Sequence, residues 1–276
     1  MMNYHKKKQL GLSLIELLVV MIIGLFITIG ISSVYVGNKR TSMTTDELSL
    51  LQANGRAVID QLTQVIQHTG YKSVRSPLGP DMFILGAIST SMCSGGADSV
   101  VNTGLFSALQ NDGPNGDTIG VVYLGDDLLT TDCAGNVIPT DCRISETNSA
   151  PVAAARIYNY FEANVNANGM PVLTCSGSRG AAVEEIAEGV ENLQFSYGED
   201  IDSDGVPDRF VNSDDVTNWG SIVSINVAVL VRSLMPVAVS ARPRTYQLLN
   251  DTLINTNDKY LRAVFTTTIR LRNAVS

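Results

Sequence analysis

An uncharged, largely apolar segment near the N-terminus constrains this chain more than any other feature. No charged side chain occurs between Glu16 and Lys39, and residues 17–38 would form a helix about 33 Å long, enough to cross a bilayer core of about 30 Å. Three lysines at residues 6–8 precede it, so the positive-inside rule predicts a cytoplasmic N-terminus and places the rest of the chain outside. The segment is longer than the apolar region of a cleaved secretory signal, and no A-x-A site follows it, which disfavours that alternative.

The helical pattern continues beyond the apolar segment. Between Leu48 and Ile66, apolar residues recur at spacings of three and four, and polar residues occupy the other positions. Gly70 and the Pro- and Gly-containing residues 76–80 provide a stop signal. We therefore expect one long helix over residues 12–70, with a transmembrane part at about residues 12–36 and an amphipathic part that packs against a soluble body.

Period-two alternation dominates the remainder, residues 71–276. The clearest alternating segments are 223–232 and 265–272, and shorter candidates are 117–124, 156–162 and 190–197. Alternation of this kind predicts strands with one buried face. The expected fold class is therefore α+β, with a long N-terminal helix packed on a mainly antiparallel β-sheet head.

The composition excludes several classes of function. The formal net charge is −8, and it would be −11 without residues 1–11, which argues against direct nucleic-acid binding. The two histidines are His5 and His68, too few to build a Ser-His-Asp site, a Cys-His site or a His-rich metal centre. We expect no enzymatic activity.

The four cysteines are widely spaced and form no CxxC pair; they are Cys93, Cys133, Cys142 and Cys175. An even number of cysteines outside the cytoplasm favours structural disulfides over a zinc or redox motif. Three pairings are possible, and free buried thiols are the alternative to any of them.

An acidic loop has the spacing of a calcium-binding loop. Its candidate ligands are Asp200, Asp202, Asp204, the Val206 carbonyl and Asp208, with Gly205 at the position of the sharp turn. Position twelve, where a calcium loop of the EF-hand type has Glu, is Val211; Glu199, Asp214 or Asp215 could supply a further ligand instead. The alternative is a solvated acidic turn between two strands, because Asp and Gly are favoured in turns without any ion.

A carboxylate at the start of an apolar helix needs an explanation. Glu16 could lie near enough to the interface to reach water. The N-terminus, however, resembles that of type IV prepilins: a short basic leader ends at Gly11, and Glu16 is the fifth residue after it. The resemblance implies that a prepilin peptidase cleaves between Gly11 and Leu12 and methylates the new amine of Leu12, where the family usually has Phe or Met. It also implies a role of Glu16 in assembly, through pairing with the amine of a neighbouring subunit.

The head resembles the PilW family of minor pilins in four segments, which are residues 173–175, 188–198, 229–233 and 265–273. The resemblance implies a minor pilin that primes type IV pilus assembly and sits in a tip complex, supporting twitching motility, adhesion or DNA uptake. Implied partners are prepilin peptidase, other minor pilins, the major pilin and the inner-membrane assembly machinery.

The implied location is the inner membrane, with a periplasmic head, before assembly, and the extracellular pilus afterwards. The alternatives are a GspJ-like minor pseudopilin of type II secretion and a membrane-tethered calcium-binding surface protein.

The C-terminal half also carries several arginines on the predicted strands. We expect these side chains to be exposed and solvated, without a role; they are Arg232, Arg242, Arg244, Arg262, Arg270 and Arg272.

Overall fold

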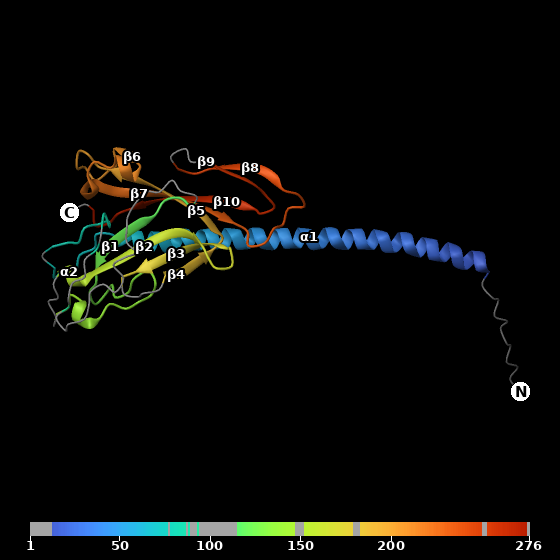
Figure 1. The fold of residues 1–276 in the computed structure, drawn as a ribbon, viewed down its shortest axis with the longest axis horizontal. Coiled ribbons are helices and arrows are strands. Elements are labelled where there is room, and N and C mark those ends of the chain that lie inside the picture. The colour runs from blue at the N-terminus through green and yellow to red at the C-terminus, as the bar shows by residue number, and fades with distance from the viewer. Residues whose placement is uncertain are drawn as a thin grey trace, which may run out of the picture. The chain divides into compact units, whose positions relative to one another are not determined.

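A computed structural model describes residues 13–76, 78–86, 88, 93, 115–146, 152–178, 183–249 and 253–274. The chain divides into two compact units, residues 1–46 and residues 47–276. Helix α1, Leu14–Gln67, runs through the boundary between them, close to the predicted helix limits of 12 and 70 (Figure 1). The C-terminal third of α1 therefore belongs to the head.

In the first unit, the side chains of α1 are almost all exposed, including the large apolar ones from Leu14 to Val36. By length and composition, α1 contains a stretch able to cross a membrane. Apolar side chains that are exposed on all faces of a helical stretch require an apolar environment, such as the core of a bilayer.

In the head, α1 buries one face against the sheets. Leu51, Val58, Leu62 and Ile66 are buried at the spacings of an amphipathic helix, as the pattern predicted. Gly55 lies on the same face, and a Cβ atom there would meet the ring of Phe265. The absence of a side chain at this position lets the aromatic ring pack directly on the helix backbone.

The end of α1 is fixed by a glycine. Gly70 has φ +72°, a left-handed conformation that glycine adopts without strain. Its N–H donates to the Val122 carbonyl at 2.8 Å, and the Asn273 side chain donates to the Thr69 carbonyl at 3.1 Å. Gly70 is thus the stop that the sequence predicted.

The described part of the head contains two antiparallel four-stranded sheets. The first has the order β1-β2-β3-β4 and consists of β1 (Ile119–Leu124), β2 (Arg156–Val165), β3 (Pro171–Gly177) and β4 (Val183–Glu188). The second has the order β10-β7-β5-β6 and consists of β5 (Val190–Glu199), β6 (Arg209–Val211), β7 (Ile222–Arg232) and β10 (Arg262–Arg270). Both sheets and α1 contribute to one hydrophobic core. The predicted α+β class is confirmed.

The described connections between strands include four short helices, which are η1 (Thr140–Cys142), α2 (Val152–Ala155), η2 (Ser213–Asp215) and η3 (Trp219–Ser221). A separate hairpin is formed by β8 (Arg242–Gln247) and β9 (Leu253–Asp258).

This hairpin corrects one expectation from the sequence. Alternation in 223–232 predicted a strand with a single buried face, but nearly every residue of β7 is buried. Ala228 and Leu230 on the second face pack with Leu248, and Ile254 of the hairpin packs against this cluster. Small and apolar residues at the supposedly outward positions were the sign of this second layer.

Both predicted disulfides form, and the structure pairs Cys93 with Cys142 and Cys133 with Cys175. None of the four cysteines is free. The second bond ties the loop after β1 to strand β3. A disulfide of this kind stabilises the head mainly by restricting the unfolded chain.

Candidate functional site

The predicted processing and assembly residues lie at the start of α1. Gly11 and Leu12 lie outside the described residues, and Glu16 occupies the first turn of α1, where it is exposed. The next charged residue along the helix, Lys39, is about 35 Å away along the helix axis. Within the described part of the apolar segment, the chain therefore offers Glu16 no opposite charge.

The acidic loop connects β5 to β6, and three of its carboxylates converge. Oxygen atoms of Asp200, Asp202 and Asp208 all lie within 4.8 Å of one another. Backbone N–H groups hold two of them in place: Gly205 donates to Asp200 Oδ2 at 2.8 Å, and Ile201 donates to Asp208 Oδ2 at 2.7 Å. Closely spaced carboxylate oxygens on a tight turn are the arrangement that a hard cation such as Ca²⁺ prefers.

Other predicted ligands are not part of this group. Asp204 Oδ1 accepts a hydrogen bond from the Val206 N–H at 2.8 Å, and Asp204 does not belong to the convergent group. Asp214 and Asp215 lie on η2, also outside the group. The structure thus brings together three of the four predicted aspartates.

Glu199 has a structural role, so the expectation that it could be a calcium ligand is wrong. Its buried carboxylate accepts hydrogen bonds from the Thr217 hydroxyl, from Arg209 Nη2 at 2.7 Å and from the Asn218 N–H at 2.9 Å. The hydrogen bond from Thr217, followed by that from Arg209, lowers the pKa of Glu199 to about 2. Glu199 therefore fastens the segment after β6 to the end of β5 and has no oxygen left for the loop.

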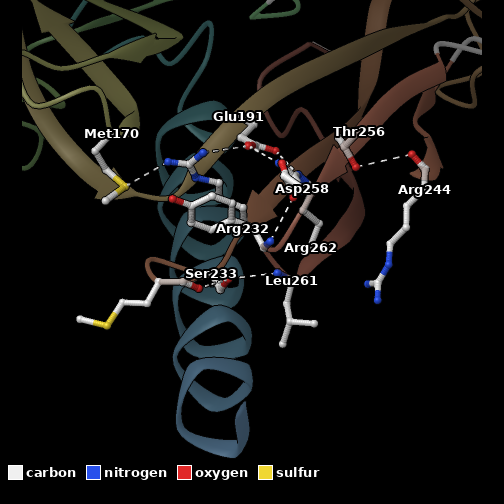
Figure 2. Close-up of polar contacts among 11 residues, drawn as sticks. Met170, Glu191, Arg232, Ser233, Arg244, Thr256, Asp258, Leu261 and Arg262 are labelled. Carbon is white, nitrogen blue, oxygen red and sulfur yellow. Dashed lines mark hydrogen bonds and ion pairs between the residues drawn. The ribbon is translucent and has the colours of Figure 1, made fainter. Parts of the chain in front are cut away.

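A second charged cluster was missed by the sequence analysis and lies between β5, β7, β9 and β10 (Figure 2). Arg262 donates to Glu191 at 2.5 and 2.9 Å and to Asp258 at 2.6 and 2.7 Å, and its side chain is only 4% exposed. Arg232 lies 3.5 Å from Glu191 and stacks over the Tyr260 ring at 4.3 Å.

The expectation that Arg232 and Arg262 are solvated is therefore wrong. Hydrogen bonds from Arg262 lower the pKa of Asp258. Burial alone would lower the pKa of Arg262, but the two carboxylates outweigh it and raise that pKa. The cluster joins the β8–β9 hairpin to the second sheet. Its charges cancel internally, so it is a structural anchor of the head.

Two family models match the chain. Residues 6–32 match the prokaryotic N-terminal methylation motif, and residues 160–273 match type IV pilus-assembly protein W. No curated protein matches the chain. A solved structure of a type IV-like pilin from Thermus thermophilus is similar to it at 14% sequence identity and a TM-score of 0.38, covering 84% of this chain and 98% of that chain.

Proposed function

Because the chain is a type IV pilin-like protein of the PilW type, we propose that it is a minor pilin that primes type IV pilus assembly and sits in the tip complex of the filament. In that role it supports twitching motility, adhesion or DNA uptake. Its partners are prepilin peptidase, other minor pilins, the major pilin and the inner-membrane assembly machinery. The observation that carries this proposal is Glu16, a carboxylate on an exposed apolar helix that has no charge partner along the described apolar segment.

The proposed assembly step begins with processing. Prepilin peptidase cleaves between Gly11 and Leu12 and methylates the α-amine of Leu12, which leaves a positive charge at the start of the apolar helix. That amine pairs with Glu16 of a neighbouring subunit. A buried charge is costly when unpaired and tolerable when paired, so the pairing fixes the axial register between subunits.

Before assembly, the protein is proposed to cross the inner membrane once, with a cytoplasmic N-terminus and a periplasmic head. After assembly, it is part of the extracellular pilus. The apolar N-terminal part of α1 and the methylation motif support membrane anchoring.

Replacement of Glu16 by Gln tests this proposal because it removes the charge and keeps the shape. A strain lacking the gene is complemented with the parent, Glu16→Gln or the matched control Ser13→Ala, and surface pili are sheared and quantified together with twitching. We expect Glu16→Gln to lose piliation while the control retains it. Parent-level pili and parent-level incorporation of the Glu16→Gln variant would contradict the proposal.

The pseudopilin alternative predicts a different phenotype. Loss of exoprotein secretion with normal surface pili in the deletion strain would assign the chain to type II secretion. We expect the reverse, with pili lost and secretion unchanged.

We also propose that the acidic loop binds calcium, since Asp200, Asp202 and Asp208 converge on one point. The Val206 carbonyl and Asp204 are additional candidate ligands. Calcium neutralises carboxylates that otherwise repel one another, and binding to the folded state alone raises its stability. The melting temperature of the chelator-treated protein should therefore rise when millimolar calcium is added.

A matched pair of variants locates the effect. Asp208→Asn removes one converging carboxylate and should abolish the calcium-dependent shift, whereas Asp214→Asn, an exposed change on η2, should retain it. An equal calcium response in both variants, or none in the parent, would refute this site.

A further inference from the structure

The segment joining β7 to β8 exposes apolar side chains on the head. Its residues 234–239 are Leu, Met, Pro, Val, Ala and Val, yet Met235 is 57% exposed and Val239 is 74% exposed. Pro236 between them is also exposed. A connecting segment this apolar usually turns its side chains into a core, so its exposure calls for an explanation.

Hydrogen bonds hold this segment in its exposed position. The Glu47 carboxylate of α1 accepts from the Leu234 N–H at 3.0 Å and from the Met235 N–H at 3.2 Å. The Ser233 hydroxyl donates to the Met235 carbonyl at 2.8 Å and accepts from the Leu261 N–H at 3.0 Å (Figure 2). The turn is therefore fixed to α1 on one side and to the start of β10 on the other.

The second half of the segment is fixed as well. The N–H groups of Val237 and Ala238 both donate to the Lys259 carbonyl at 3.0 Å. Hydrogen bonds therefore hold the backbone between residues 233 and 238, and this backbone presents Met235 and Val239 at the surface of the head.

Basic residues lie close to this segment in the chain or through its backbone contacts: Arg242 and Arg244 follow Val239 by three and five residues, and the Lys259 carbonyl accepts the hydrogen bonds described above. Arg242, Arg244 and Lys259 are exposed, and Figure 2 shows Arg244 and Leu261 extending away from the ion-pair cluster in the same direction. Two acidic groups near this region are engaged in contacts, Glu47 with backbone N–H groups and Asp258 with Arg262. We call the set Met235, Pro236, Val239, Arg242, Arg244 and Lys259 the basal surface. It is cationic on a chain whose formal net charge is −8.

We propose that the basal surface docks on the anionic surface of the bilayer that holds the subunit before assembly. Apolar side chains that enter the headgroup boundary, surrounded by Lys and Arg that contact anionic lipids, are the chemistry of an interfacial anchor. The position of Glu47 in the sequence is consistent with this proposal. Glu47, which binds the backbone of Leu234 and Met235, follows Asn38, the last residue of the uncharged segment, by only nine residues. The proposal depends on the membrane insertion described above and is independent of any role at the tip.

Labelling at residue 239 tests the contact in the full-length chain. All four native cysteines are in disulfides, so Val239→Cys adds the one thiol that reacts with a fluorescent label. The chain is placed at one copy per nanodisc, in discs of phosphatidylcholine alone or of equal parts phosphatidylcholine and phosphatidylglycerol. A lipid with a nitroxide on its headgroup reports contact by quenching, and Leu128→Cys, at a site 82% exposed in the loop after β1, is the matched control.

We expect at least twofold stronger quenching at residue 239 than at residue 128 in the anionic discs, and a smaller difference in the neutral discs. Arg242→Gln and Arg244→Gln should each lower the ratio of docked to free heads by about fivefold, the effect of one basic side chain at an anionic surface. A label on Met235→Cys repeats the measurement if Val239→Cys does not fold.

Equal quenching at both sites, or quenching unaffected by lipid charge, overturns the docking while leaving the proposed pilin function intact. Docking of the basal surface only on an acidic protein partner, seen as crosslinking to another pilin without lipid quenching, also overturns it. A chain that does not insert into the discs at all would contradict both this inference and the proposed membrane anchoring.

Discussion

Replacement of Glu47 should show that its buried carboxylate stabilises the head, unlike an exposed carboxylate on the same helix. It is 7% exposed, and one carboxylate oxygen accepts two backbone hydrogen bonds, from Leu234 and Met235. Glu47→Ala removes the acceptor and leaves both N–H groups without it. Asp46→Ala, at the neighbouring exposed position of the same helix, is the matched control.

The expected magnitude follows from these two bonds. A hydrogen bond to a charged group contributes about 1.5–3 kcal/mol, and we take the lower value for each because the turn lies at the surface. Glu47→Ala should therefore reduce the free energy of unfolding by about 3 kcal/mol, and Glu47→Gln, which keeps a neutral acceptor, by about half of that. The melting temperature should fall by about 6–12 °C for Glu47→Ala, whereas the change for Asp46→Ala should stay within about 0.5 kcal/mol.

Thermal unfolding in detergent, followed by the fluorescence of the single tryptophan Trp219, measures these changes in the head. Hydrogen exchange of the Leu234 and Met235 amides provides a local readout, since both should lose protection in Glu47→Ala. If Glu47→Ala and Asp46→Ala unfold at the same temperature and exchange at the same rate, the assigned role of the carboxylate is wrong.

Three further predictions concern the packing and charges of the head. Gly55→Leu should destabilise it by about 2 kcal/mol because the new side chain meets the Phe265 ring, and a second change, Phe265→Ala, should recover part of the loss in a thermal-unfolding cycle. The pKa of Glu199 is about 2 in the folded head, below its value of about 4.5 in the unfolded chain, so its stabilising contribution is present above pH 4.5 and is lost as the pH falls toward 2. In this pH window the parent should take up about one more proton on unfolding than Glu199→Gln does, so the melting temperature of the variant should depend less steeply on pH. An unchanged slope would contradict the assignment. Arg262→Met should cost about 3 kcal/mol in urea unfolding, since Glu191 and Asp258 both lose the cation they share, and a neutral outcome would show that the ion-pair cluster is dispensable.

The sequence predicted those parts of the fold that depend on local patterns. The limits of α1 followed from one uncharged segment, one amphipathic repeat and Gly70 as a stop, and all three signals act over neighbouring residues. The second face of β7 could not be assigned in this way, because the hairpin that covers it comes later in the chain. Ala228 and Leu230 on that face become buried only when the hairpin of β8 and β9 packs over them.

The same distinction applies to the candidate sites. The acidic loop is contained within nine consecutive residues, so its spacing was visible, and three of its carboxylates do converge. The ion-pair cluster could not be recognised from the sequence, since Glu191 lies 41 residues from Arg232 and 71 residues from Arg262. Glu199 was misjudged for a related reason, because its partner Thr217 is 18 residues away along the chain.

The central claim is that the chain is processed as a prepilin, and mass spectrometry of the mature N-terminus tests it most directly. Protein purified from cells with an active prepilin peptidase should yield an N-terminal peptide that begins at N-methylated Leu12, and cells lacking the peptidase should retain residues 1–11. A mature chain that keeps residues 1–11 in the presence of the peptidase, or that begins beyond Glu16, would contradict the account.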